Sequence, residues 1–221
     1  MKTIYKKIAC DNIDDVLGNF NIEKIKYKSS LLEDWLSIQN TAENVLTPTQ
    51  SILFQDILTQ LNADVEIWNE EELKIKALSL IFYIAQMEAA PRVKMFFERS
   101  LHAVIGSFSI DVKVDCMLAT PWGTGTPQYP YFFLQEFKQE KKKSLDPEAQ
   151  MLAAMVAAQV INKSDQPLYG SYIVGRDWFF GVLEGKIYTI SNAYNATKET
   201  DLREIVFILR RLKQIILTQL I

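Results

Sequence analysis

The sequence is poor in the residue types that define several protein classes. It holds two cysteines, Cys10 and Cys116, among 221 residues, too few for a disulfide scaffold or a cysteine-based metal cluster. Its 8 glycines and 7 prolines exclude a collagen-like or linker-dominated chain. No apolar run approaches the roughly 20 residues of a membrane-spanning helix. The single histidine, His102, weighs against zinc hydrolases and against catalytic sites that need two histidines.

The charge and the first residues narrow the class further. The chain has 24 Lys and Arg against 27 Asp and Glu, so its net charge is −3. This charge does not favour a protein that coats nucleic acid, although an enzyme with one local basic strip remains compatible with it. Asp11, Asp14 and Asp15 follow the N-terminus where a secretory signal would have apolar residues. We therefore expect a cytoplasmic globular protein with reduced thiols and no membrane partner.

Two segments are expected along the chain. Residues 1–66 are predicted to form an N-terminal helical elaboration, and residues 67–221 an α/β core that packs with it as one globular unit. Helical patterns in the first segment cover Ile13–Phe20 and Leu31–Gln39. A longer helix begins at Thr47-Pro48, because a threonine N-cap followed by proline is typical of a helix start.

The core segment changes from helical to alternating periodicity. A helix is predicted from Asn69, with acids at Glu70–Glu72 in its first turn, where the helix dipole favours them. Apolar and polar residues then alternate over Ile110–Leu118, which is typical of a strand with one polar face. A loop is expected over Ala119–Pro130, and an apolar, aromatic strand over Tyr131–Lys138.

The C-terminal part continues this alternation of strands and helices. An alanine-rich helix is predicted from Asp146-Pro147, and an amphipathic helix from about Thr200. Between them lie three candidate strands, Tyr169–Val174, Trp178–Leu183 and Ile187–Ser191. The predicted fold class is therefore mixed α/β, with helices covering a central sheet.

Three charged side chains on the first two expected strands form the candidate site. Glu136 and Lys138 are two residues apart on one strand, so both leave the same face, and Asp115 lies on the polar face of the preceding strand. Antiparallel pairing of these strands would bring the two carboxylates close together. The carboxylates repel each other, and a divalent cation removes that conflict, because Mg²⁺ binds one or two carboxylates together with waters and phosphate oxygens. We predict Mg²⁺ or Mn²⁺ at Asp115 and Glu136, with Lys138 placed to orient the attacking water or offset transition-state charge.

The Glu-x-Lys pattern is weak evidence by itself. The chain holds three further such pairs: Glu72/Lys74, Glu140/Lys142 and Glu184/Lys186. Glu136/Lys138 differs because it lies on an apolar strand, follows a strand that carries an acid, and precedes a capped helix. The alternative interpretation is a solvated sheet face with a cross-strand salt bridge of little energetic value.

The motif residues are Val114-Asp115 and Phe133–Lys138, followed by a helix with Gln150 near its start. In these residues the sequence resembles the PD-(D/E)XK nuclease superfamily, which has the restriction-endonuclease-like fold. The resemblance covers about half of the chain, from Asn69 to Val174. It implies a core of one helix, a three-stranded meander, a second helix and a further strand. It also implies metal ligation by Asp115 and Glu136 and a catalytic role for Lys138.

The same resemblance implies two supporting residues. One is an acid on the first core helix, for which Glu70 fits best and Glu72 next. The other is Gln150, which matches a glutamine that some members carry on the helix after the motif. Two positions depart from the superfamily pattern, because Val114 stands in place of proline and Ala154 in place of the tyrosine of a Gln-x-x-x-Tyr motif.

The function that follows is hydrolysis of phosphodiester bonds in nucleic acid, DNA in preference to RNA. Lys141, Lys142 and Lys143 extend the basic side of Lys138 and are expected to contact backbone phosphate. Two alternatives stay open. The fold could serve as a catalytically silent binding or regulatory module that needs a partner, or the apolar stripe of the C-terminal helix could form a homodimer.

Overall fold

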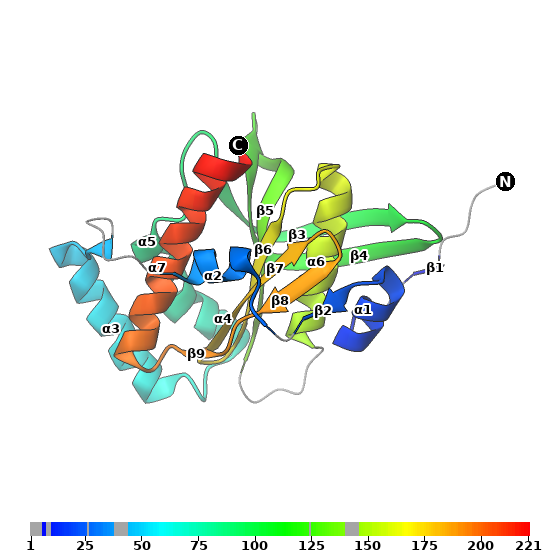
Figure 1. Ribbon diagram of the computed structural model, residues 1–221. Helices are drawn as coiled ribbons and strands as arrows, with labels where there is room; N and C mark the ends of the chain where they lie inside the picture. Colours follow the sequence, from blue (N-terminus) through cyan, green and yellow to red (C-terminus); the bar gives the residue numbers. More distant parts are fainter. Residues whose placement is uncertain (1–5, 8–9, 26, 38–43, 124, 140–145) are drawn as a thin grey trace.

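A mixed sheet forms the centre of the molecule, with helices on both faces (Figure 1). The computed structural model describes residues 6–7, 10–25, 27–37, 44–123, 125–139 and 146–221. Parallel and antiparallel strand pairs occur in the same sheet, and helices alternate with strands along the chain. The predicted mixed α/β class is therefore confirmed.

The sheet is built around an antiparallel meander that a parallel strand extends. Its main strands are β3 (Lys94–Ile105), β4 (Phe108–Trp122), β5 (Thr126–Lys138), β6 (Leu168–Val174), β7 (Asp177–Glu184) and β8 (Ile187–Ile190). They lie in this order, and every neighbouring pair is antiparallel except β5 and β6, which are parallel. Three short strands complete the sheet: β1 (Lys6–Lys7) beside β4, β2 (Glu23–Lys24) beside β8 and β9 (Tyr194–Asn195) beside β7.

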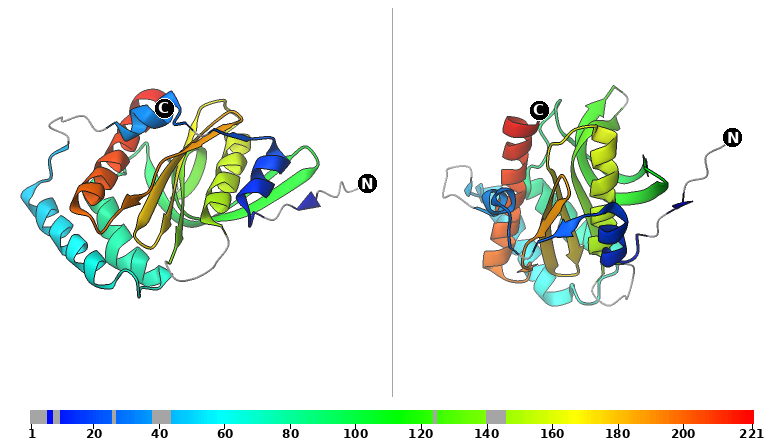
Figure 2. Two further views of the ribbon diagram at one scale, coloured as in Figure 1. Left: turned by 60° about the horizontal axis from the view of Figure 1, so that its bottom comes forward. Right: turned by 45° about the vertical axis from the view of Figure 1, so that its right-hand side comes forward.

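The helices divide between the two faces of the sheet, as the right-hand view of Figure 2 shows. One face carries α2 (Ser30–Leu36), α3 (Pro48–Asp64), α4 (Glu70–Leu73), α5 (Ser79–Ala85) and α7 (Glu199–Ile215). The other face carries α1 (Ile13–Phe20) and α6 (Pro147–Asn162). Two π-helical segments extend this set: η2 (Lys74–Leu78), which joins α4 to α5, and η3 (Ile216–Leu220), which follows α7.

The helix starts follow from side chains that cap free backbone N–H groups. Thr47 with Gln50, and Asn69 with Glu72, form capping boxes at the starts of α3 and α4. Asp146 caps α6 by accepting hydrogen bonds from the first backbone N–H groups of that helix. These caps confirm the three helix starts predicted from the sequence.

Small residues let α6 lie close to the sheet. Its five alanines are fully buried: Ala149, Ala153, Ala154, Ala157 and Ala158. The sheet contributes Gly170 at the same place, where an added Cβ would come within 2.9 Å of the sulfurs of Met151 and Met155. Met117, expected on a polar strand face, is instead fully buried in the core under α6. This part of β4 is therefore buried on both faces, with Met117 under α6 and Cys116 and Leu118 in the opposite core.

The prediction of a loop over Ala119–Pro130 is wrong. β4 continues to Trp122, and β5 begins at Thr126, directly opposite it. The glycine and proline content indicated a loop, but among the described residues of the turn only Gly125 has a positive φ, of +82°. A shift of register between Ala119 and Thr120 leaves Pro130 without a paired residue, so this proline stays within β5.

Among the described residues, none of the helices combines the length and the apolar character that crossing a lipid bilayer requires.

Candidate functional site

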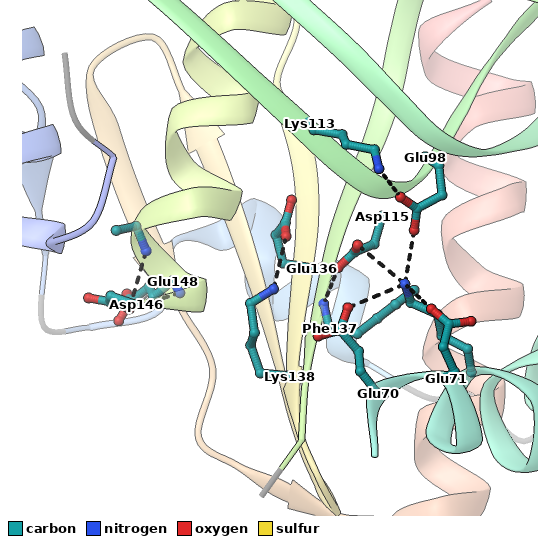
Figure 3. Close-up of polar contacts among 12 residues, drawn as sticks. Glu70, Glu71, Glu98, Lys113, Asp115, Glu136, Phe137, Lys138, Asp146 and Glu148 are labelled. Atoms are coloured by element: carbon teal, nitrogen blue, oxygen red, sulfur yellow. Dashed lines mark hydrogen bonds and ion pairs between the residues drawn. The ribbon is translucent and has the colours of Figure 1, made fainter. Parts of the chain in front are cut away.

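The candidate site lies where β4 and β5 separate. The last residues that pair at this end are Cys116 and Gln135. Beyond them, Oδ2 of Asp115 accepts a hydrogen bond of 2.8 Å from the backbone N–H of Phe137. The side chain of Asp115 thus bridges the opening strands, and its charge acts on Glu136 (Figure 3). The structure therefore brings together the two carboxylates that the sequence placed on neighbouring strands.

Glu136 is a buried carboxylate with an unsatisfied oxygen. It is 3% exposed, and among the described residues its Oε1 has no hydrogen-bond partner. Lys138 lies beside it, with Nζ 3.9 Å from Oε2. Burial raises the pKa of Glu136 well above its ordinary value, the charge of Asp115 raises it further, and Lys138 offsets only part of this. A charged Glu136 is therefore unfavourable in the absence of a further cation.

The raised pKa of Glu136 predicts how the stability of the metal-free protein depends on pH. The folded protein keeps this proton to a higher pH than the unfolded chain does, so Glu136 costs stability as pH rises from 4.5 through its folded-state pKa. Glu136→Gln removes this cost. We expect its free energy of unfolding, relative to the wild type, to increase steadily as pH rises above about 4.5 in urea titrations with chelator present. Glu184→Gln, at an exposed carboxylate, is the control; pH profiles of Glu136→Gln and the wild type that run parallel would contradict the assignment.

A second ammonium group, that of Lys74, reaches Asp115 from the end of α4. Its Nζ lies 3.6 Å from Oδ1 of Asp115 and 3.3 Å from Oε1 of Glu70. It also lies 2.9 Å from Oε1 of Glu98 and 3.5 Å from Oε1 of Glu71. Figure 3 shows these contacts converging on one point between the helix and the strands. Glu70 is thereby linked to Asp115 through Lys74.

Glu72, the other acid considered for the supporting role, has different partners. Its carboxylate accepts a hydrogen bond of 2.9 Å from the backbone N–H of Asn69 and lies 3.4 Å from Nζ of Lys76. The first contact caps α4, and the second is an ion pair with a residue one helical turn further along the chain. Of the two candidates, Glu70 is the one that contacts Lys74 at the site.

Gln150 lies in the first turn of α6. Its Oε1 is buried and has no hydrogen-bond partner within the described part of the chain. In Figure 3 the start of α6, marked by Asp146 and Glu148, lies on the other side of Lys138 from Asp115. The basic residues Lys141, Lys142 and Lys143 lie outside the described residues.

Sequence reasoning missed two residues of the cluster, Lys74 and Glu98. Lys74 had a usable signal, because it follows Glu70 by four residues on a helix, a spacing that favours an ion pair. Glu98 had none, because its position depends on an unusual backbone conformation in β3, with φ at +55°. Glu98 also pairs with Lys113 of the neighbouring strand.

The residues fit a Mg²⁺ ion better than a metal that needs a full set of protein ligands. Within the described ranges, no group of three or more His, Cys, Asp or Glu is arranged to hold a metal ion. Mg²⁺ needs only one or two protein carboxylates, because waters and substrate phosphates complete its coordination. Asp115 and Glu136 supply two, and the unsatisfied Oε1 of Glu136 is an oxygen that such an ion would pair.

Comparison of the sequence with protein-family models and with curated proteins finds no match to either. The functional assignment therefore depends on the geometry of the site and on the resemblance of its motif.

Proposed function

We propose that the protein is a metal-dependent nuclease of the PD-(D/E)XK type that hydrolyses phosphodiester bonds of DNA in preference to RNA. One observation carries the proposal. Glu136 is a buried carboxylate with an unpaired oxygen, it lies beside the carboxylate of Asp115, and the ammonium of Lys138 is 3.9 Å from its other oxygen. A structural salt bridge would leave neither a second carboxylate beside the first nor a buried oxygen without a partner.

The order of elements around the site supports the proposal. A helix, from α4 through α5, precedes the antiparallel meander of β3, β4 and β5. The helix α6 then leads into β6, which lies parallel to β5. This is the succession that the resemblance implies, and the motif residues lie on the two meander strands that it implies.

In the proposed mechanism, Asp115 and Glu136 would hold Mg²⁺ or Mn²⁺. When bound, the ion supplies a water of lowered pKa and offsets charge on the phosphoryl oxygens. The side chain of Lys138 is 16% exposed, so its ammonium can donate a hydrogen bond to the attacking water or to a phosphate oxygen. In the metal-free protein Glu70 is linked to Asp115 through Lys74, and Gln150 offers its unpaired amide oxygen at the start of α6. Lys141–Lys143 are proposed to contact the nucleic-acid backbone.

Asp115→Asn tests the metal site directly. Asparagine keeps the size of the side chain and an oxygen that can accept from the Phe137 N–H, so the fold should be retained. We expect the affinity for Mg²⁺ or Mn²⁺, measured by calorimetry, to fall about 10- to 100-fold, because the ligand loses its charge. The control is Asp111→Asn. Asp111 lies on the exposed part of the same strand, where it pairs with His102, so this variant should bind metal as the wild type does.

Cleavage of double-stranded, single-stranded and branched DNA is measured in parallel with metal binding. The nuclease proposal is supported if the wild type releases or absorbs heat on binding metal, if this heat disappears in Asp115→Asn, and if cleavage depends on metal. Metal binding without cleavage of any of these substrates favours the silent binding module instead. A wild-type protein that binds neither ion counts against the metal site itself.

A further inference from the structure

The less engaged oxygen of Asp115 faces the ammonium of Lys74. Oδ2 of Asp115 is already engaged by the backbone N–H of Phe137 at 2.8 Å. Oδ2 keeps one further lone pair, but Oδ1 is the less engaged oxygen, and it lies 3.6 Å from Nζ of Lys74. A Mg²⁺ ion bound to Oδ1 at about 2.1 Å would lie within about 6 Å of this ammonium. Two cations at that separation repel each other strongly in a partly buried site.

The environment holds Lys74 in this position as a charged group. Burial lowers the pKa of Lys74, but the hydrogen bond to Glu98 and the charges of Asp115 and Glu70 outweigh this and raise its pKa above the ordinary value. The ammonium also lies 5.8 Å from the centre of the Phe137 ring, within the range of a cation–π contact. These contacts hold the ammonium of Lys74 beside Asp115 in the metal-free protein.

Negative charge nevertheless exceeds positive charge in this cluster. Four carboxylates contact Lys74: those of Glu70, Glu71, Glu98 and Asp115. Among the described residues, one further ammonium group, that of Lys113, forms an ion pair with any of these four carboxylates, and its partner is Glu98. Four carboxylates against two ammonium groups leave a net charge of −2, which is the charge that one divalent cation neutralises. The unpaired oxygen of Glu136, 3% exposed and beside Asp115, independently indicates a place for a cation.

Two irregular backbone segments meet at the pair formed by Lys74 and Glu98. Glu98 has a φ of +55° within a strand, a conformation that residues with a side chain seldom adopt. Lys74 begins the π-helical segment η2, in which the N–H of Ser79 bonds to the Lys74 carbonyl. Such irregularities persist where the surrounding structure holds them in place, and they cluster at functional sites.

We infer that Lys74 is an exchangeable internal cation: its ammonium neutralises Asp115 and Glu70 in the metal-free protein and leaves Asp115 when a divalent cation is bound there. Glu71 provides a place for the displaced group, because its carboxylate is 3.5 Å from Nζ and 74% exposed. The flexible lysine stem permits this short shift toward solvent. The inference depends on the metal site proposed above.

Lys74→Met tests the competition by metal binding. Methionine has a similar length and can pack on the Phe137 ring, but it removes the competing charge. We expect the dissociation constant for Mg²⁺ or Mn²⁺, measured by calorimetry on the full chain, to decrease about tenfold. Lys76→Met is the matched control, because Lys76 lies on the same helical stretch and pairs with Glu72, away from Asp115. Lys74→Arg keeps the charge and should bind metal within about threefold of the wild type.

A purely structural role for Lys74 gives a different result. Lys74→Met would then lose thermal stability, and its metal affinity would equal that of the wild type or fall below it. Competition instead predicts that saturating metal raises the melting temperature of Lys74→Met by more than that of the wild type or of Lys76→Met. An equal rise in all three proteins would overturn the inference.

The wild-type protein provides a second test that does not depend on how a variant folds. The hydrogen-bonded ammonium of Lys74 is followed by ¹H–¹⁵N NMR of ¹⁵N-labelled lysine while Mg²⁺ is added, with Lys74→Arg identifying the signal. We expect the signal to shift or broaden as metal binding saturates; an unchanged signal at saturation refutes displacement while leaving the proposed metal site intact. If neither the wild type nor Lys74→Met binds metal, the proposed site and this inference fail together.

Discussion

Lys138→Met is expected to lower the rate of metal-dependent cleavage by about 100- to 1000-fold, the effect typical of removing one donor aimed at developing charge. Methionine keeps the length of the side chain but has no ammonium to orient water or to stabilise a phosphoryl oxygen. The native ammonium lies 3.9 Å from Glu136 and is partly exposed, so it can reach both the carboxylate and a bound substrate. Initial rates at saturating metal and substrate measure this loss.

The matched control is Lys186→Met. Lys186 belongs to another Glu-x-Lys pair, but it is exposed on the turn between β7 and β8 and should leave the rate unchanged. Calorimetry separates chemistry from binding, because Lys138→Met removes a nearby positive charge and should bind metal at least as tightly as the wild type. A Lys138→Met protein that cleaves within about threefold of the wild-type rate would remove Lys138 from the mechanism.

The meeting of Asp115 and Glu136 could be predicted because it depends on short-range rules. Alternation places each carboxylate on a strand face, and two strands close in the chain tend to pair antiparallel. Phe137, between Glu136 and Lys138, packs into the opposite core, as the two-residue period requires. Cys116 is fully buried, but it packs in the opposite core from Val114, so the strict alternation expected along Ile110–Leu118 breaks at Asp115.

The surroundings of the two carboxylates could not be predicted in the same way. Lys74 reaches Asp115 from a helix that lies far earlier in the chain, and no local pattern encodes that approach. Glu98 meets Lys74 only because its backbone is left-handed within β3. Burial of Glu136 likewise follows from packing between the sheet and the helices, so its raised pKa has no signature in the sequence.

The fold shows a similar division between local and long-range information. The caps at Thr47, Asn69 and Asp146 are local signals, and the predicted helix starts agree with them. The hairpin at Trp122 and Thr126 was predicted as a loop, because its prolines and glycines mask the strand pairing that tertiary contacts impose. The two-residue strands β1 and β2 are too short to produce a pattern at all.

The largest effect on stability is expected from Trp35→Ala. Trp35, on α2, is fully buried, and its indole N–H donates a hydrogen bond of 3.0 Å to the carbonyl of Ile208 in α7. Its ring makes edge contacts with three aromatic rings of the sheet, those of Phe133, Tyr169 and Phe180. Removing it leaves a cavity where α2, α7 and the sheet meet, so we expect a loss of about 3–5 kcal/mol in the free energy of unfolding, measured in urea.

Two further variants separate the contributions of Trp35. Trp35→Phe keeps an aromatic ring but lacks the N–H, and it should cost about 1–3 kcal/mol, less than the alanine variant does, because the void is smaller and one hydrogen bond is lost. Trp122→Ala removes a ring that is 62% exposed and should change stability by no more than about 0.5 kcal/mol. Since a protein of this kind is stable by only about 5–15 kcal/mol, Trp35→Ala should unfold at a much lower urea concentration than either. Equal unfolding midpoints for Trp35→Ala and Trp122→Ala would show that the segment before α3 does not contribute to the core that positions α7 on the sheet.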